Sequence, residues 1–243
     1  ELPQKTRPAR GTGRRFHGAI AHKLGVAIMS GEYLPGAFLP TEMSYSETLE
    51  VSRSAYREAI QVLTAKGLVE SRPKSGTKVL PRNRWNLLDP QVLGWAFAGE
   101  PDPKYVQDLF GLRAIIEPAA AALAAENRDR DQLKIMGDAL LAMHRETLAS
   151  EAGRAADRDF HDAILLATGN DALLALSSSI GAAVNSTTQF KMRSRALPRD
   201  PIPDHRKVYD AIAAKDPVAA QAAMRLLVEM AFEDTQMAMA GKP

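Results

Sequence analysis

The sequence contains no cysteine among its 243 residues. This absence excludes a disulfide framework, thiolate metal ligands and cysteine nucleophiles, and it is compatible with a reducing compartment. Uninterrupted apolar runs are also too short to cross a membrane. Residues 1–15 carry five basic side chains and lack the apolar centre of a secretory signal. We therefore expect a cytoplasmic protein that has no membrane partner.

Net charge is low, at +2, but it is divided unevenly along the chain. Residues 1–84 contain 14 Lys or Arg against 7 Asp or Glu, whereas residues 85–243 contain 17 against 22. The basic first part can face phosphate groups, with binding that weakens as salt rises. Residues 1–15 are predicted to form a flexible basic arm, either a solvated tail or one that follows a nucleic-acid backbone. The length and the 45% hydrophobic content predict two domains.

Two short helices with N-cap signals are predicted between residues 41 and 67. Thr41 can accept hydrogen bonds from the backbone N–H groups that open one helix, and Ser52 can do so for the next. Apolar residues recur with helical period in the second helix until Gly67, which suits the left-handed position after a helix end. Arg53 and Arg57 project from one side near its N-terminus, the end that a recognition helix inserts into the major groove. The predicted DNA-binding residues of this region are Thr41, Ser52, Arg53, Ser54 and Arg57.

After the second helix the pattern changes to that of a hairpin. Residues 68–72 and 77–80 are predicted strands. The turn between them offers a cation, a hydroxyl and a glycine that can approach a sugar-phosphate chain closely: Lys74, Ser75 and Gly76. Together these elements predict a winged helix-turn-helix on double-stranded DNA. The alternative is that the two arginines only decorate a solvated helix.

Several motifs in this region resemble the winged helix of the GntR family. They are Gly31-Glu32-Tyr33, Pro35-Gly36, Leu39-Pro40-Thr41-Glu42, Val51-Ser52-Arg53, Arg57-Glu58-Ala59 and Gly67-Leu68-Val69. The resemblance implies a DNA-binding domain over residues 16–82 and a homodimer on palindromic operator DNA. Two positions depart from the family pattern: Met43 stands where a DNA-contacting arginine is usual, and Glu50 stands where glycine is usual.

Residues 83–102 are predicted to link the two domains. The segment starts polar and becomes apolar, so Trp85 and Trp95 are expected to dock against one domain. Its amino-acid sequence from Arg82 to Trp95 resembles the corresponding segment of regulators of galactonate catabolism in the FadR branch of the GntR family. That resemblance suggests an aldonate such as galactonate as effector, with other organic acids as alternatives.

From Asp102 onward the sequence predicts helices only. Asp102-Pro103 combines an N-cap with proline at the first helical position. Asp131 is expected to cap the next helix, and one long helix is expected to begin at Asp171. Further helices are predicted over 153–168, over 204–214 and after Asp216. Short loops and many alanines predict an antiparallel α-helical bundle over residues 103–240, so the whole protein is expected to be mainly α.

A carboxylate and two imidazoles form a candidate metal site in this bundle. Asp157 and His161 lie four residues apart on one face of a predicted helix, and His205 opens another helix. If they converge, they can hold a divalent ion and leave coordination positions open. Zn²⁺ is the first expectation, with Ni²⁺ and Mn²⁺ as alternatives. From these residues alone, an exposed Asp-His ion pair competes with metal binding.

Further motifs resemble the FCD domain, the ligand-binding domain of the FadR branch. They are Asp157-Arg158-Asp159-Phe160-His161, Gly169-Asn170 and the segment 204–212. The resemblance implies a metal held by Asp157, His161 and His205. Leu227 takes the place of a further histidine that many FCD domains supply, which leaves three protein ligands.

The segment Leu112 to Pro118 resembles the FCD helix whose arginine faces the effector cavity. Arg113 is therefore expected to clamp a carboxylate, and its alternative role is a surface pair with Glu117. Other candidates for lining the cavity are Asn185, Thr188, Gln189, Arg193 and Arg195.

These features predict a transcriptional regulator, not an enzyme. We expect a homodimeric repressor of a catabolic operon that senses a small carboxylate through a metal-containing pocket. A metal-dependent enzyme is the competing class, because one carboxylate and two imidazoles also suit metal-assisted hydrolysis, but no nucleophile or general base accompanies them. A third interpretation is that the bundle only dimerises, or binds a larger carboxylated metabolite without metal.

Overall fold

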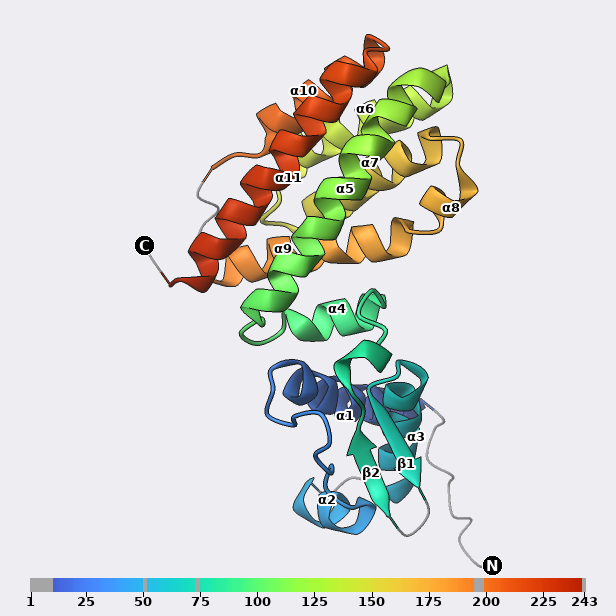
Figure 1. Cartoon of the computed structure of the whole chain (residues 1–243), viewed down its shortest axis with the longest axis vertical. Coiled ribbons are helices and arrows are strands. Elements are labelled where there is room, and N and C mark those ends of the chain that lie inside the picture. The colour runs from blue at the N-terminus through green and yellow to red at the C-terminus, as the bar shows by residue number, and fades with distance from the viewer. Residues whose placement is uncertain (1–10, 50–51, 73–74, 195–198, 242–243) are drawn as a thin grey trace, which may run out of the picture. The chain divides into compact units, whose positions relative to one another are not determined.

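The computed structural model describes residues 11–49, 52–72, 75–194 and 199–241. Contacts divide the chain into two compact units, Glu1–Gly99 and Glu100–Pro243. The first unit combines helices with a two-stranded hairpin, and the described part of the second consists of helices (Figure 1). The predicted fold, mainly α with a small β wing in its N-terminal part, is confirmed.

The first unit contains the predicted helix-turn-helix and wing. Its elements are α1 (Gly11–Met29), α2 (Glu42–Leu49), α3 (Arg53–Ala65), β1 (Val69–Arg72) and β2 (Gly76–Val79). α1, α2 and β1 all pack against α3. β1 and β2 pair antiparallel, with Val69 opposite Val79 and Arg72 opposite Gly76. The wing therefore stands beside the helix that carries the two arginines.

The predicted signals at the ends of α2 and α3 are present. Thr41 Oγ1 accepts a hydrogen bond from Ser44 N at 3.2 Å, and Ser52 Oγ accepts one from Ala55 N at 3.2 Å. Gly67 has a φ of +70°, and a Cβ at this position would lie 2.2 Å from the Arg84 carbonyl oxygen. Both facts require glycine after α3, which fixes the point where the chain leaves the helix for the wing.

The segment after the wing folds back onto the first unit. It contains the 3-10 helix η1 (Arg82–Arg84) and α4 (Pro90–Ala96). Trp85 Nε1 donates to the Leu80 carbonyl at 2.8 Å, and a Cβ on Gly25 of α1 would meet the Trp95 ring at 2.3 Å. Both tryptophans thus dock against one unit, as predicted. The boundary between the units falls after Gly99, inside the predicted linker.

The structure corrects the extent of the predicted basic arm. α1 begins at Gly11, so residues 11–15 belong to a helix and not to the arm. These positions continue the helix that buried Ile20 and Leu24 anchor in the first unit. Residues 1–10 and Glu50 lie outside the described residues.

The second unit is a helical bundle. Its elements are α5 (Pro103–Asn127), α6 (Arg130–Glu146), α7 (Glu151–Ala167), α8 (Asp171–Leu174), α9 (Ser177–Ser194), α10 (Ile202–Ala213) and α11 (Pro217–Met239). α7 packs against α5, α6 and α9, while α11 lies along α5 and also contacts α9 and α10. Residues on the inner face of α7 therefore meet side chains from several helices. No helix in the described residues combines the length and apolar character needed to span a bilayer.

One predicted helix start and one predicted helix length in this unit are wrong. Asp129, not Asp131, caps α6, because its side chain accepts from Gln132 N while the Gln132 side chain accepts from Asp129 N. The long helix predicted from Asp171 is broken after Leu174. Two local i to i+3 hydrogen bonds close a turn there, from Leu176 N to Leu173 O and from Ser179 N to Leu176 O.

Candidate functional site

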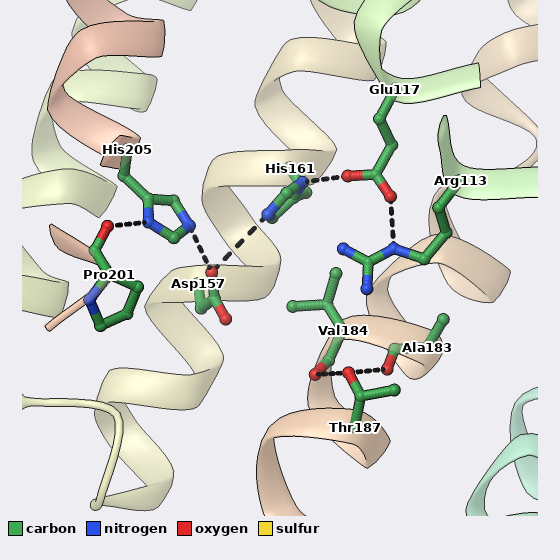
Figure 2. A network of polar contacts seen from close by, with 9 residues as sticks. All are labelled: Arg113, Glu117, Asp157, His161, Ala183, Val184, Thr187, Pro201 and His205. Atoms are coloured by element: carbon green, nitrogen blue, oxygen red, sulfur yellow. Dashed lines mark hydrogen bonds and ion pairs between the residues drawn. The ribbon is translucent and has the colours of Figure 1, made fainter. Parts of the chain in front are cut away.

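A cluster of polar side chains lies in the interior of the second unit (Figure 2). Asp157 and His161 stand one turn apart on α7, and His205 is in the first turn of α10. Each of the three side chains is only 3% exposed. The structure therefore brings together the three predicted metal ligands, and it excludes the exposed ion pair that competed with a metal site.

The inner nitrogens of both imidazoles face the same carboxylate oxygen. His205 Nε2 lies 3.0 Å from Asp157 Oδ1, and His161 Nε2 lies 3.7 Å from it. One ligand atom from each residue falls within 4.8 Å of the others. A divalent ion with ligand distances of about 2.0–2.2 Å fits such a group after small side-chain movements, because each nitrogen can turn from the carboxylate to the ion.

The outer nitrogens of the two imidazoles also have partners. His205 Nδ1 lies 2.8 Å from the Pro201 carbonyl oxygen, and His161 Nδ1 lies 2.9 Å from Glu117 Oε2. A carbonyl or carboxylate behind each imidazole is the usual arrangement around a metal-bound histidine, because it fixes the tautomer that presents Nε2 to the ion. The donor set and its surroundings thus fit a metal.

Glu117 connects Arg113 to the cluster formed by Asp157, His161 and His205. Arg113 Nε donates to Glu117 Oε1 at 2.6 Å, and the two residues are 3% and 2% exposed. The pair predicted from their spacing therefore forms, but inside the bundle and not on its surface. Glu117 Oε2 has the His161 ring as its partner, so this carboxylate contacts Arg113 through one oxygen and His161 through the other.

Burial and charge set the protonation of these groups. Burial alone raises the pKa of Glu117, but Arg113 and His161 outweigh it and lower that pKa to about 2. Burial likewise raises the pKa of Asp157, yet the hydrogen bond and charge of His205 hold it below its ordinary value. For His161, burial lowers the pKa, but the Glu117 carboxylate outweighs this effect and raises it. Both carboxylates are therefore ionised and available to cations.

The sequence analysis missed a second buried cation. Lys191 is 7% exposed on α9, one turn beyond Thr187 and two turns beyond Val184 on the same helix face. Burial first, followed by repulsion from Arg113, lowers the pKa of Lys191 to about 8, against the opposing charges of Asp234 and Asp157. Its spacing from the apolar Val184 was the available signal, because a lysine on the inner face of a helix is unusual.

The other cavity candidates differ in their exposure. Asn185 accepts a hydrogen bond from Arg158 Nη1 at 2.9 Å, and Thr188 is buried. Gln189 and Arg193 are exposed, so the prediction that they line a buried cavity is wrong. Arg195 lies outside the described residues.

In the first unit, most of the predicted DNA-binding residues lie near the start of α3 and on the wing. Ser52, Arg53 and Ser54 are exposed at the N-terminal end of α3. A groove of about 790 Å³ runs between the segment before α2, the exposed side of α3 and the wing. Three of the predicted residues line it: Thr41, Arg57 and Gly76. Ser75 is exposed beside Gly76, and Lys74 lies outside the described residues.

A winged helix with a groove lined by Arg57, followed by a helical bundle that buries one carboxylate and two imidazoles, is the architecture of a DNA-binding transcriptional regulator. The chain belongs to the gntR family of bacterial regulatory proteins, which residues 17–79 match, and residues 108–230 match the FCD domain. The expectation of a regulator and not an enzyme is confirmed by this family.

Individual relatives agree with the family. The galactonate operon transcriptional repressor of Escherichia coli is 35% identical over 212 residues, which cover 86% of this chain and 92% of the repressor. LutR, a transcriptional regulator of Bacillus subtilis, is 31% identical over 202 residues, and the match covers 81% of this chain and 90% of LutR. Among solved structures, Lar of Listeria monocytogenes matches 95% of this chain and 99% of its own, with a TM-score of 0.65 and 19% identity. This last likeness concerns the fold alone.

Proposed function

We propose that this regulator represses a catabolic operon and releases its operator when a small carboxylate binds a metal-containing pocket in the second unit. The observation that carries the proposal is the buried arrangement of Asp157, His161 and His205. Their inner atoms face one point, and the outer nitrogens of both imidazoles are held by Pro201 and Glu117. Metal-bound histidines usually have such partners behind them. Without a metal, burying these polar groups would cost free energy through lost hydration.

Three protein ligands leave room on the ion for another group. The described part of the chain groups only these three His, Asp or Glu residues at ligand spacing, and Leu227 is a buried apolar residue of α11. A Zn²⁺ ion held by three ligands keeps at least one position for water or an effector oxygen, and Ni²⁺ or Mn²⁺ keeps more. When bound, the metal would supply a Lewis-acidic contact for an oxygen of the effector.

Two buried cations suit an anionic effector. Arg113 uses Nε for Glu117, and its two terminal nitrogens point away from Glu117 in Figure 2. These terminal nitrogens would bind a carboxylate, and Lys191 would add a second positive charge from α9. An aldonate is the first choice, because its carboxylate and 2-hydroxyl can share the ion. The galactonate operon repressor that this chain resembles supports that choice.

Operator release requires the acid to favour one conformation of the dimer over another. Occupancy of the pocket is not sufficient, because a ligand that binds two conformations equally shifts neither. The acid would draw together α5, α7 and α10, which carry Arg113, Asp157 and His205. We expect this movement to change the spacing of the two winged helices in a homodimer, so that they no longer match adjacent half-sites of a palindromic operator.

When the regulator is bound to its operator, the first unit would contact DNA through the start of α3 and through the wing. Arg53 and Arg57 would reach base edges or phosphates from α3. Thr41, Ser52 and Ser54 would contact the backbone, together with Lys74, Ser75 and Gly76 at the wing tip.

The metal part of the proposal is tested by comparing two histidine variants of the full chain. His161→Ala removes a ligand, whereas His144→Ala removes an exposed histidine of the same unit. We expect metal analysis to find about one Zn²⁺ per wild-type or His144→Ala chain and much less in His161→Ala. D-galactonate should raise the melting temperature of the first two proteins only, and a chelator should abolish that rise. No bound metal in the wild type and no change of response in His161→Ala would favour a bundle that serves only for dimerisation. Equal metal content in all three metal-bearing proteins would exclude His161 as a ligand.

A further inference from the structure

A carboxylate lies on the surface that is proposed to bind DNA. Glu42 Oε2 accepts from Arg57 Nε at 2.6 Å, so the acid contacts the arginine directly. The Arg57 side chain is 71% exposed and the Glu42 side chain is 25% exposed. Both residues line the groove between α3 and the wing. Glu42 therefore stands next to the path expected for DNA, where its charge repels phosphate.

Stability alone does not explain this pair. Ion pairs between exposed side chains contribute little to folding, because water screens them and ordering two long side chains opposes them. A negative charge beside a phosphate backbone weakens binding at low salt. The pair therefore has a clear disadvantage for binding and only a small advantage for folding, which points to a role in DNA recognition.

Glu42 binds the Nε side of the Arg57 guanidinium and leaves its two terminal nitrogens available. With Nε bound to Glu42, the two terminal nitrogens remain to face the O6 and N7 acceptors of a guanine, which is how arginine reads that base. An arginine whose guanidinium is already oriented loses less freedom when it binds. The pairing through Nε thus orients Arg57 for a bidentate contact with a base and favours this over non-specific contacts with phosphates.

Glu42 is itself held in place from two sides. It is the first residue of α2, where its charge suits the positive end of the helix dipole, and Thr41 caps that helix. The Tyr56 hydroxyl, next to Arg57 on α3, donates to the Pro40 carbonyl. The chain is therefore tied to α3 just before Glu42, so the carboxylate has a fixed position relative to Arg57.

We propose that Glu42 is a positioning residue for sequence recognition: it orients Arg57 so that the arginine reads a guanine of the operator, at the cost of general affinity for DNA. The inference rests on the proposed contact between Arg57 and DNA. It predicts that removing an acid from this surface weakens operator binding, which is the opposite of the simple electrostatic expectation.

The test measures the affinity of the full-length protein for two duplexes by fluorescence anisotropy at one salt concentration. One duplex is the operator fragment and the other has the same composition in scrambled order. Glu42→Ala should lower operator affinity by about tenfold, as expected for one bidentate base contact, without lowering affinity for the scrambled duplex. Glu58→Ala is the matched control, because it removes an acid of α3 that pairs with His17 and not with Arg57. It should raise both affinities slightly and equally.

Two further variants separate orientation from charge. Glu42→Gln keeps a hydrogen-bond acceptor for Arg57 Nε and should keep the preference for the operator. In an Arg57→Ala background, Glu42→Ala should not change that preference further. If Glu42→Ala instead raises both affinities as Glu58→Ala does, or lowers the preference equally without Arg57, the positioning role is wrong. If Arg57→Ala alone leaves the preference intact, the proposed DNA contact of Arg57 has failed, which is a different result.

Discussion

At the scale of single residues, the central feature is that the buried carboxylates of Glu117 and Asp157 each have arginine or histidine partners beside them. Glu117 contacts both Arg113 and His161, and Asp157 contacts His161 and His205. A buried carboxylate without a partner would be strongly unfavourable. The chain of contacts therefore couples the arginine proposed for the effector to the ligands proposed for the metal.

Glu117 is predicted to tune metal affinity although it is not a ligand. Glu117→Gln removes the charge that holds His161 Nδ1, and changes of this kind weaken metal binding by about 10- to 100-fold. Competition for Zn²⁺ with a chromophoric chelator measures the effect. Asp138→Asn, which removes an exposed carboxylate paired with Lys134, is the control. Equal Zn²⁺ affinity of Glu117→Gln and wild type would show that Glu117 serves only Arg113.

Lys191 is predicted to make acid binding depend on pH. Burial lowers its pKa to about 8, and its charged neighbours are Asp234 of α11, Arg113 of α5, Asp157 of α7 and Arg199. An anionic effector favours the protonated lysine, so affinity for D-galactonate should fall as pH rises above about 8, by up to about tenfold per unit. Calorimetric titration between pH 7 and pH 9 measures this loss. Lys191→Met should bind more weakly at pH 7 and lose the dependence, and a wild-type affinity that is constant over this range would exclude Lys191 from the site.

The sequence predicted the members of the cluster better than their surroundings. The spacing of Asp157 and His161 was sufficient to place both on one face of a helix. The spacing of Arg113 and Glu117 likewise predicted their pair. Whether that pair faces water or the interior depends on which helices cover α5, and this is decided by contacts far apart in sequence. Lys191 was missed for the same reason.

At the scale of elements, the glycine after α3 fixes how the recognition helix joins the wing. Gly67 has a positive φ, and any Cβ there would meet the Arg84 carbonyl. Its position ties the end of α3 to the segment that leads into α4. The orientation of the wing relative to α3 thus depends on a position outside the predicted DNA-binding residues.

Gly67→Ala is predicted to destabilise the first unit. The left-handed conformation costs alanine about 1–2 kcal/mol, and the clash with a backbone oxygen adds to this. Gly18→Ala is the control, because it lies on α1 with no atom near the added Cβ and should stabilise slightly through helix propensity. Denaturant unfolding followed by tryptophan fluorescence measures both, since Trp85 and Trp95 lie in this unit. A Gly67→Ala protein as stable as wild type would contradict the clash.

Caps and glycines predicted most helix ends, but not all of them. The caps at Thr41 and Ser52 were predicted, because a hydroxyl before an apolar periodic run has few other local roles. Asp131 was predicted to cap α6, but the cap is Asp129, because its side chain and that of Gln132 bond reciprocally to the backbone. The break after Leu174 was missed, because no proline or glycine marks it and turn hydrogen bonds form it.

At the scale of the whole molecule, positive charge is concentrated in the part that contains the winged helix. We therefore predict that the logarithm of operator affinity falls linearly with the logarithm of salt concentration. If Arg53 contacts a phosphate, Arg53→Ala should reduce the slope by about one. Anisotropy titrations between 50 and 300 mM KCl measure this, with Arg145→Ala, an exposed arginine of the second unit, as the control. An unchanged slope for Arg53→Ala would exclude a phosphate contact by that residue.

The most direct test of the proposed regulator uses the metal-loaded protein and a labelled duplex taken from beside its own gene. Anisotropy is recorded with and without D-galactonate and related sugar acids, and again after the metal is removed by chelation. We predict tight binding to this duplex that an acid weakens at least tenfold, and only while the metal is present. Operator binding that no acid changes, or that responds equally with and without metal, would contradict the proposal that a metal-bound acid controls the DNA-binding unit.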